Sequence, residues 1–164
     1  MLTLGSGKPA GFTSIPSAIG KLTSLAALVF CEFQLNGTIP SEMGLFTVLN
    51  ILSLQKNSIN GTLPEELSKI SQLHSLDIQS NKLEGKILEQ GALHLNKLRL
   101  VQIGDNLFSG SLPTEVGLWS SLEKLELQNT KISGTLLTEL LLLDNLTSLV
   151  VMNTLDRKYP SWTV

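Results

Sequence analysis

The sequence predicts an α/β-type solenoid, in which the chain winds into thin, similar coils around one continuous core. Three observations lead to this prediction. A repeat of about 24 residues runs along nearly all of the 164-residue chain. Each copy opens with alternating apolar residues, and several copies continue with a G-x-I/L-P element. Leucine and isoleucine rather than aromatic residues, which make up 5% of the chain, supply the core of such thin layers.

The repeat appears when the sequence is shifted against itself. The aligned copies are LAALVFCEFQLNGTIP from Leu25, LNILSLQKNSINGTLP from Leu49, LHSLDIQSNKLEGKIL from Leu73, LRLVQIGDNLFSGSLP from Leu98 and LEKLELQNTKISGTLL from Leu122. A sixth copy, LTSLVVMNTL, begins at Leu146 and stops early, and an incomplete first copy precedes Leu25. Their shared pattern is L-x-x-L-x-L-x-x-N-x-L-x-G-x-I/L-P-x-x-L, which is too long to recur by chance.

The start of each copy predicts a short strand. Alternation with a period of two, as at Leu52 and Leu54, places the apolar side chains on one face and the intervening ones on the other. One such strand cannot bury its apolar face alone. Stacking successive copies gives a parallel sheet with strands about 4.8 Å apart, and the inward leucines then form a continuous core.

With these motifs the chain resembles leucine-rich repeats of the plant type, on the G-x-I/L-P elements at Gly37/Ile39/Pro40, Gly61/Leu63/Pro64 and Gly110/Leu112/Pro113. The resemblance implies a right-handed superhelix with a parallel concave β-sheet and short 3₁₀ or irregular convex segments, including a short extra strand. Two copies depart from the pattern, with Leu88 and Leu137 where proline is expected. The spacing between Asn81 and Asn106 is one residue longer than the others, which predicts a small bulge on the convex side.

We expect a single leucine-rich-repeat domain over residues 1–164. Its expected units are a partial repeat 1–21, repeats at about 22–45, 46–69, 70–94, 95–118 and 119–142, and a partial repeat 143–164. The ends lack cysteine-bearing caps, and the tail LDRKYPSWTV leaves the pattern. Either Tyr159 and Trp162 fold over the last coil, or neighbouring repeats of a longer chain cover it; we favour the longer chain.

The turn after each strand needs partners for its backbone groups. The resemblance implies a buried side-chain amide at Asn57, Asn81 and Asn106, where an amide can both donate and accept. Leaving such a buried group unpaired costs roughly 1–3 kcal/mol. Since Phe33, Thr130 and Thr154 replace asparagine in the outer copies, we expect the asparagine ladder to be best formed in the middle.

No residue pattern predicts catalysis or a cofactor. His74 and His94 lie outside any nucleophile motif, and neither H-E-x-x-H nor G-x-S-x-G occurs. The lone Cys31 excludes an internal disulfide and Cys/His zinc spacing. A net charge of −2 gives no basic footprint for nucleic acid, and the most apolar stretch, Leu136 to Val151, is too interrupted to enter a membrane. We therefore expect no enzyme activity, no metal and no cofactor in this chain.

The outward strand residues predict a partner-binding surface on the concave face. Two columns run between and after the inward leucines, and in the middle coils they offer hydroxyls, amides and carboxylates to a protein or peptide. The candidate contact residues are Ser53, Gln55, Asp77, Gln79, Gln102, Glu126 and Gln128. The columns continue outward through Gly5, Gly7, Val29, Cys31, Gly104, Val150 and Met152, and the next residues are Lys8, Glu32, Lys56, Ser80, Asp105, Asn129 and Asn153.

The predicted function is a non-catalytic protein- or peptide-recognition module of a receptor-like protein at the cell surface or outside the cell. The alternatives are a cytoplasmic scaffold and a regulatory repeat region of a larger enzyme such as a receptor kinase. Three N-x-[ST] sequons, at Asn36, Asn60 and Asn145, are candidate glycosylation sites if the chain is secreted.

Overall fold

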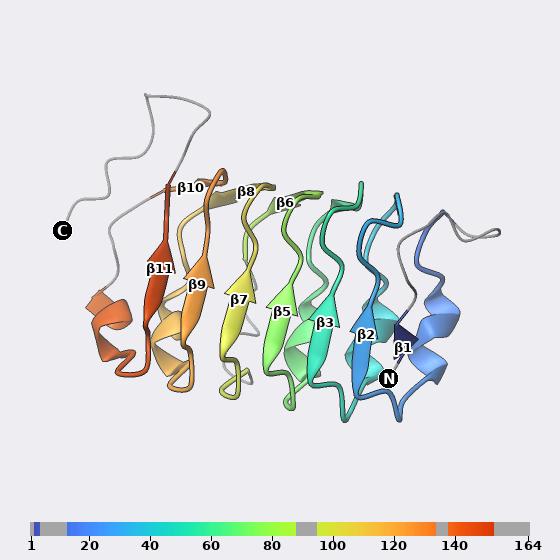
Figure 1. The fold of residues 1–164 in the computed structure, drawn as a ribbon, viewed down its shortest axis with the longest axis horizontal. Coiled ribbons are helices and arrows are strands. Elements are labelled where there is room, and N and C mark those ends of the chain that lie inside the picture. The colour runs from blue at the N-terminus through green and yellow to red at the C-terminus, as the bar shows by residue number, and fades with distance from the viewer. Residues whose placement is uncertain (1, 4–12, 88–94, 134–137, 153–164) are drawn as a thin grey trace.

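The main feature of the computed structural model is a seven-stranded parallel sheet, and the structure describes residues 2–3, 13–87, 95–133 and 138–152. In Figure 1 its strands stand side by side in chain order from β1 to β11. The strands are β1 Leu2–Thr3, β2 Ala27–Val29, β3 Ile51–Ser53, β5 Ser75–Asp77, β7 Leu100–Gln102, β9 Lys124–Glu126 and β11 Ser148–Val150. This arrangement confirms the predicted α/β-type solenoid with one strand per coil.

The inward residue of each strand pairs with its equivalent in the next coil. Leu52 pairs with Leu76, which pairs with Val101, and each of these side chains is at most 4% exposed. A second inward column lies two residues further along each coil. It consists of Phe30, Leu54, Ile78, Ile103 and Leu127. The inward columns therefore form one core that runs the length of the sheet, as the alternation predicts.

A second, shorter parallel sheet lies beyond the turn of each coil. It contains β4 Asn60–Gly61, β6 Lys82–Gly85, β8 Leu107–Gly110 and β10 Lys131–Ile132, in the order β10-β8-β6-β4. The repeated glycines belong to this region and have positive φ, between 72° and 87°, at Gly37, Gly61, Gly85 and Gly110. Glycine adopts this left-handed region without the steric penalty that a Cβ brings, so backbone geometry explains its recurrence.

Where the return path is described, it contains a 3₁₀ helix behind the main sheet (Figure 1). These helices are η1 Ser17–Lys21, η2 Ser41–Leu45, η3 Glu65–Lys69, η5 Thr114–Leu118 and η6 Thr138–Leu142. The proline of the G-x-I/L-P element precedes the helix, and its carbonyl accepts the first i→i+3 hydrogen bond, as from Met43 N to Pro40 O at 3.1 Å. Met43, Leu67 and Val116 turn inward from these helices and close the core.

Asn57 joins its own turn to the preceding coil. Its Oδ1 accepts the N–H groups of Phe33 and Leu35, both at 3.0 Å. Its Nδ2 donates to Phe30 O at 2.7 Å and to Leu54 O at 2.8 Å. One amide therefore satisfies groups of two successive coils.

Asn81 and Asn106 repeat this arrangement in the next two coils. Asn81 accepts from Ile59 N and donates to Leu54 O and Ile78 O, at 3.0 to 3.1 Å. The corresponding partners of Asn106 are Leu83 N, Ile78 O and Ile103 O, each at 3.0 Å. In the following coil the hydroxyl of Thr130 donates to Leu127 O, the equivalent own-coil carbonyl.

The residue before each ladder position has a left-handed backbone, which the sequence does not reveal. It is glutamate, lysine, serine, aspartate or asparagine, with φ between 53° and 64°, at Glu32, Lys56, Ser80, Asp105 and Asn129. Residues other than glycine rarely adopt this backbone conformation, because their Cβ comes too close to the following carbonyl oxygen. Here each residue donates its N–H to the next coil, for example Ser80 N to Gly104 O at 3.0 Å. The coil-to-coil hydrogen bond offsets the steric cost.

Replacing Asn81 by alanine is expected to lower the free energy of unfolding by about 3 kcal/mol, because the buried Ile59 N–H and two carbonyls lose a partner. Urea denaturation measures this loss. The control Asn96→Ala changes an exposed asparagine and is expected to stay within about 0.5 kcal/mol of the parent chain. Equal midpoints for the two variants would contradict a structural role for the ladder.

Candidate binding face

The outward side of the main sheet, called the sheet face below, carries three columns of side chains. The first column is Ala27, Ile51, Ser75, Leu100, Lys124 and Ser148; the central column is Val29, Ser53, Asp77, Gln102, Glu126 and Val150; the third is Cys31, Gln55, Gln79, Gly104, Gln128 and Met152. Sequence reasoning identified the central and third columns and missed the first. The same period-two alternation, followed one step before the first inward leucine, would have found it.

Ser53 and Asp77 belong to the central column but are buried, unlike the residues of a freely exposed contact surface. Only 8% of Ser53 and 7% of Asp77 are exposed. The Ser53 hydroxyl donates to Asp77 Oδ2 at 3.4 Å, and Cys31 Sγ lies 3.2 Å from Ser53 Oγ. The Gln79 N–H donates to Asp77 Oδ1 at 3.3 Å. Neighbouring side chains therefore cover most of this carboxylate.

The environment of Asp77 favours its neutral form. Burial raises the pKa of this carboxyl above its usual range. Hydrogen bonds from the Gln79 backbone and from the Ser53 hydroxyl act in the opposite direction and offset part of the effect, while the charge of Glu126 adds to the rise in the Asp77 pKa. The hydrogen bonds to Asp77 thus offset only part of the cost of burying its charged form.

The pKa of Glu126 is shifted in the opposite direction to that of Asp77. Burial acts to raise its pKa, but hydrogen bonds from Gln102 and Lys124 and the Lys124 charge outweigh burial and hold the pKa below its usual value. The Lys124 ammonium lies 2.6 Å from Glu126 Oε1, and the Gln102 amide donates to Oε2. Gln102, Lys124 and Glu126 therefore form one hydrogen-bonded group across β7 and β9.

The third column is amide-rich. Gln79 Nε2 donates to Gln55 Oε1 at 3.5 Å, which links two neighbouring coils. Gln128 lies over Gly104, since a Cβ built on Gly104 would sit 2.4 Å from Gln128 Cδ. The seven predicted contact residues thus lie on one face of four consecutive coils, and their side chains bond mainly to each other along the sheet.

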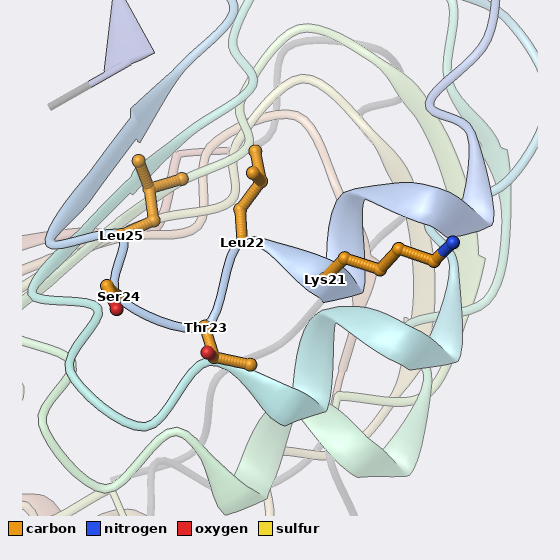
Figure 2. Close-up of a pocket in the computed structure, with 5 residues that line it drawn as sticks. All are labelled: Lys21, Leu22, Thr23, Ser24 and Leu25. Atoms are coloured by element: carbon orange, nitrogen blue, oxygen red, sulfur yellow. The ribbon is translucent and has the colours of Figure 1, made fainter.

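Two hollows in the described part of the chain lie away from this face. One, of about 340 Å³, is lined by Lys21, Leu22, Thr23, Ser24 and Leu25, which run from the end of η1 into the loop before β2. Figure 2 shows Leu22 and Leu25 extending to one side of this loop and the Lys21 ammonium pointing away from them. Another, of about 500 Å³, lies between residues 14–17 and 37–42. Neither hollow is lined by any of the seven predicted contact residues.

The three sequon asparagines are all exposed. Asn60 lies in β4 of the second sheet, and Asn36 occupies the equivalent position one coil earlier. Between these two segments Asn60 N donates to Gly37 O at 2.9 Å. Asn145 differs from them, because its Nδ2 donates to Ser120 O at 2.8 Å.

Several positions named from the sequence lie outside the described residues. They are Gly5, Gly7, Lys8, Leu88, His94, Leu137, Asn153, Thr154, Tyr159 and Trp162. Residues 88–94, where the longer spacing predicts a bulge, lie outside them as well. Of the two histidines, His74 is described; its Nδ1 lies 2.6 Å from Gln72 O.

In the described ranges, no three His, Cys, Asp or Glu side chains gather as metal ligands would. No helix there has the length and apolar character needed to cross a membrane.

Comparison with known proteins identifies the family. The Leucine Rich Repeat family model matches residues 48–70. The structure of PEPR1–AtPEP1 is similar, with 34% identity and a TM-score of 0.83 over 86% of this chain and 20% of that one. The chain is a leucine-rich-repeat protein of the plant type.

Two further solved structures are similar. The plant peptide hormone receptor RGFR1 in complex with RGF2 has 32% identity and a TM-score of 0.80, covering 85% of this chain and 22% of that one. The ectodomain of the Arabidopsis thaliana receptor kinase GASSHO1/SCHENGEN3, in complex with CASPARIAN STRIP INTEGRITY FACTOR 2, has 30% identity and a TM-score of 0.82, covering 85% and 17%. This leucine-rich-repeat chain thus spans about a fifth of their length. No curated protein matches its sequence.

Asp77→Asn is expected to change how stability depends on pH. Because burial raises the folded-state pKa of Asp77, its ionisation disfavours the fold, and this cost appears as pH rises from the ordinary value of 3.8 through the raised pKa. The variant lacks that cost, so its stability relative to the parent is expected to increase across this window and to level off above it. Urea midpoints from pH 3 to pH 7 measure the difference. A constant difference between Asp77→Asn and the parent chain over this range would argue against this assignment. Asp144→Asn, at an exposed position, is the matched control substitution.

Proposed function

We propose that residues 1–164 act as one domain, a non-catalytic recognition module that binds a protein or peptide on the sheet face. The observation that carries the proposal is the row of hydrogen-bonding side chains over β3, β5, β7 and β9. These side chains are not part of the core, so they can vary without disturbing the stacked coils. The structures with RGF2 and with CASPARIAN STRIP INTEGRITY FACTOR 2 support this assignment.

The proposed contact residues are Ser53, Gln55, Asp77, Gln79, Gln102, Glu126 and Gln128. Their amides both donate and accept hydrogen bonds, whereas the two carboxylates accept only. An extended peptide offers N–H and C=O groups at regular intervals, and mixed donors and acceptors along four coils suit such a backbone. The glutamines of this set are half-buried, whereas Ser53 and Asp77 are buried.

The proposed location is the cell surface or the extracellular space, within a receptor-like protein. The similarity to the ectodomain of a plant membrane receptor kinase supports this location, and the exposure of the sequon asparagines is compatible with it. A cytoplasmic scaffold and the regulatory repeats of a larger enzyme remain the alternatives. A secretion signal and a membrane span encoded in the same gene would favour the receptor-like reading over the scaffold.

Selection from a random linear peptide library is expected to enrich peptides that bind the sheet face. Gln55→Lys/Gln102→Lys/Glu126→Lys places long cations across that face, and it should weaken the enriched peptides at least about tenfold, because their polar contacts are lost. Fluorescence anisotropy of the labelled peptides measures the affinities.

The matched control is Glu42→Lys/Glu65→Lys, which adds the same formal charge on the 3₁₀ helices. It should leave the affinities within about twofold, since these side chains lie away from the sheet face. Peptides that respond equally to both variants, or a selection without any enrichment, would refute binding at this face.

Secretion of the chain from eukaryotic cells is expected to give N-glycans on Asn36 and Asn60, because both sequons are exposed. Intact mass before and after enzymatic removal of N-glycans, together with Asn36→Gln and Asn60→Gln, assigns each site. Unmodified Asn36 and Asn60 in the secreted protein would show that these two sequons are not glycosylation sites. Asn145 is expected to carry less glycan, because its amide is bonded to Ser120 O in the fold.

A further inference from the structure

Gly104 lacks a side chain in the middle of the sheet face, where its neighbours in the third column carry glutamines. The N–H of Ser80 donates to Gly104 O at 3.0 Å and that of Asp105 to Gln128 O at 2.8 Å, so Gly104 lies between the coils of Gln79 and Gln128. Gly104 is not among the glycines with positive φ. The backbone therefore does not require glycine here, unlike at Gly61 or Gly110.

The side chain of Gln128 occupies the space above Gly104. A Cβ on Gly104 would meet Gln128 Cδ at 2.4 Å and Nε2 at 2.5 Å, so glycine is needed for Gln128 to lie there. In this position Gln128 Oε1 is buried and has no hydrogen-bond partner in the described part of the chain. A buried acceptor without a donor is unfavourable. Moving this amide aside therefore breaks no hydrogen bond of Oε1 and opens a recess over a bare backbone.

The cations on and next to the sheet face are engaged in ion pairs. These pairs join Lys124 to Glu126 on the face itself, and Lys56 to Glu32 and Arg99 to Glu123 beside it. Within the described ranges, Asp77 and Asp105 have no cationic partner.

These two carboxylates belong to positions near Gly104. Asp105 follows it directly, and Asp77 pairs in register with Gln102, two residues before it. Both carboxylates accept hydrogen bonds from neutral donors: Ser53 and Gln79 for Asp77, and Asn129 for Asp105. The negative charge of both carboxylates near Gly104 thus remains unpaired.

We propose that the recess at Gly104 binds an arginine side chain of the peptide or protein partner, an assignment that rests on the proposed function. Asp77 and Asp105 supply the opposite charge, while the displaced Gln128 side chain turns its Oε1 toward a guanidinium N–H. A guanidinium presents five donors in one plane, which suits several acceptors arranged around a shallow recess better than a compact ammonium does. The matching arginine would be a specificity determinant of the partner.

The direct test is an NMR titration of the isotope-labelled full chain at low ionic strength with a capped Gly-Ser-Arg-Ser-Gly peptide. Replacing the arginine of this peptide by citrulline keeps the shape of the side chain and removes its charge. Replacing it by lysine keeps the charge and removes the planar set of N–H donors. We expect shift changes centred on Gly104 and Gln128, with the citrulline peptide at least about tenfold weaker and the lysine peptide intermediate. Equal binding of the arginine and citrulline peptides, shift changes centred elsewhere, or no binding of either at millimolar concentration would overturn the assignment.

Two variants locate the interaction. Asp105→Asn keeps a residue type that tolerates the left-handed backbone, and Gly104→Leu fills the recess; each is expected to weaken the arginine peptide at least about tenfold. Glu65→Gln removes the same single charge on η3 and should leave binding unchanged, with thermal melts confirming that all three chains are folded. An equal loss in Glu65→Gln would indicate non-specific attraction and overturn the proposal. Library-selected peptides that lack arginine yet still require the sheet face would overturn this inference alone and leave the proposed function standing.

Discussion

Each coil of this protein is completed by the coil that follows it, and the rest of the structure depends on that stacking. The Leu54 N–H donates to Asp77 O at 2.8 Å, and Ile78 N–H donates to Gln102 O at 2.9 Å. Beneath these bonds, the inward side chains of one coil are covered by those of its neighbours rather than by distant parts of the chain. Contacts of this kind are local between layers, so the core grows in one direction and no layer is self-sufficient. The asparagine ladder also makes each coil depend on its neighbour. Hydrogen bonds of Asn57, Asn81 and Asn106 each join two successive coils.

The stacking of coils stabilises a left-handed backbone in the turn after each strand. A left-handed backbone at a residue other than glycine costs roughly 1–2 kcal/mol. The solenoid accepts it at Lys56, Ser80 and Asp105, because the same conformation directs each N–H to a carbonyl of the next coil, at 2.8 to 3.0 Å. An isolated repeat would lack that carbonyl. The strained turn is therefore favourable only in a stack, which links local geometry to the cooperativity of the whole array.

Features that recur with the coil were predictable from the sequence, and features that depend on pairs of unlike side chains were not. The strands, the inward columns and the glycines with positive φ follow from the pattern, because every copy needs them for the same reason. The position of Gln128 over Gly104 exists once, and it depends on a long amide lying beside a missing side chain. The burial of Ser53 and Asp77 likewise depends on neighbours such as Cys31 and Gln79. The repeat pattern treats all outward positions alike. It therefore identifies the sheet face, but not which of its side chains are buried or which of its charges are paired.

Hydrogen exchange of a core-disrupting variant tests the dependence between coils most directly. Leu76→Asp places a carboxylate in the inward column, whereas Ser75→Asp places it on the outward side of the same strand. If stacking holds the coils together, Leu76→Asp should speed exchange at Leu54 in the preceding coil and at Ile103 in the following one, while Ser75→Asp leaves both protected. Faster exchange confined to β5 in Leu76→Asp, with neighbouring coils protected as in the parent chain, would show that the coils are stable on their own and would contradict this account.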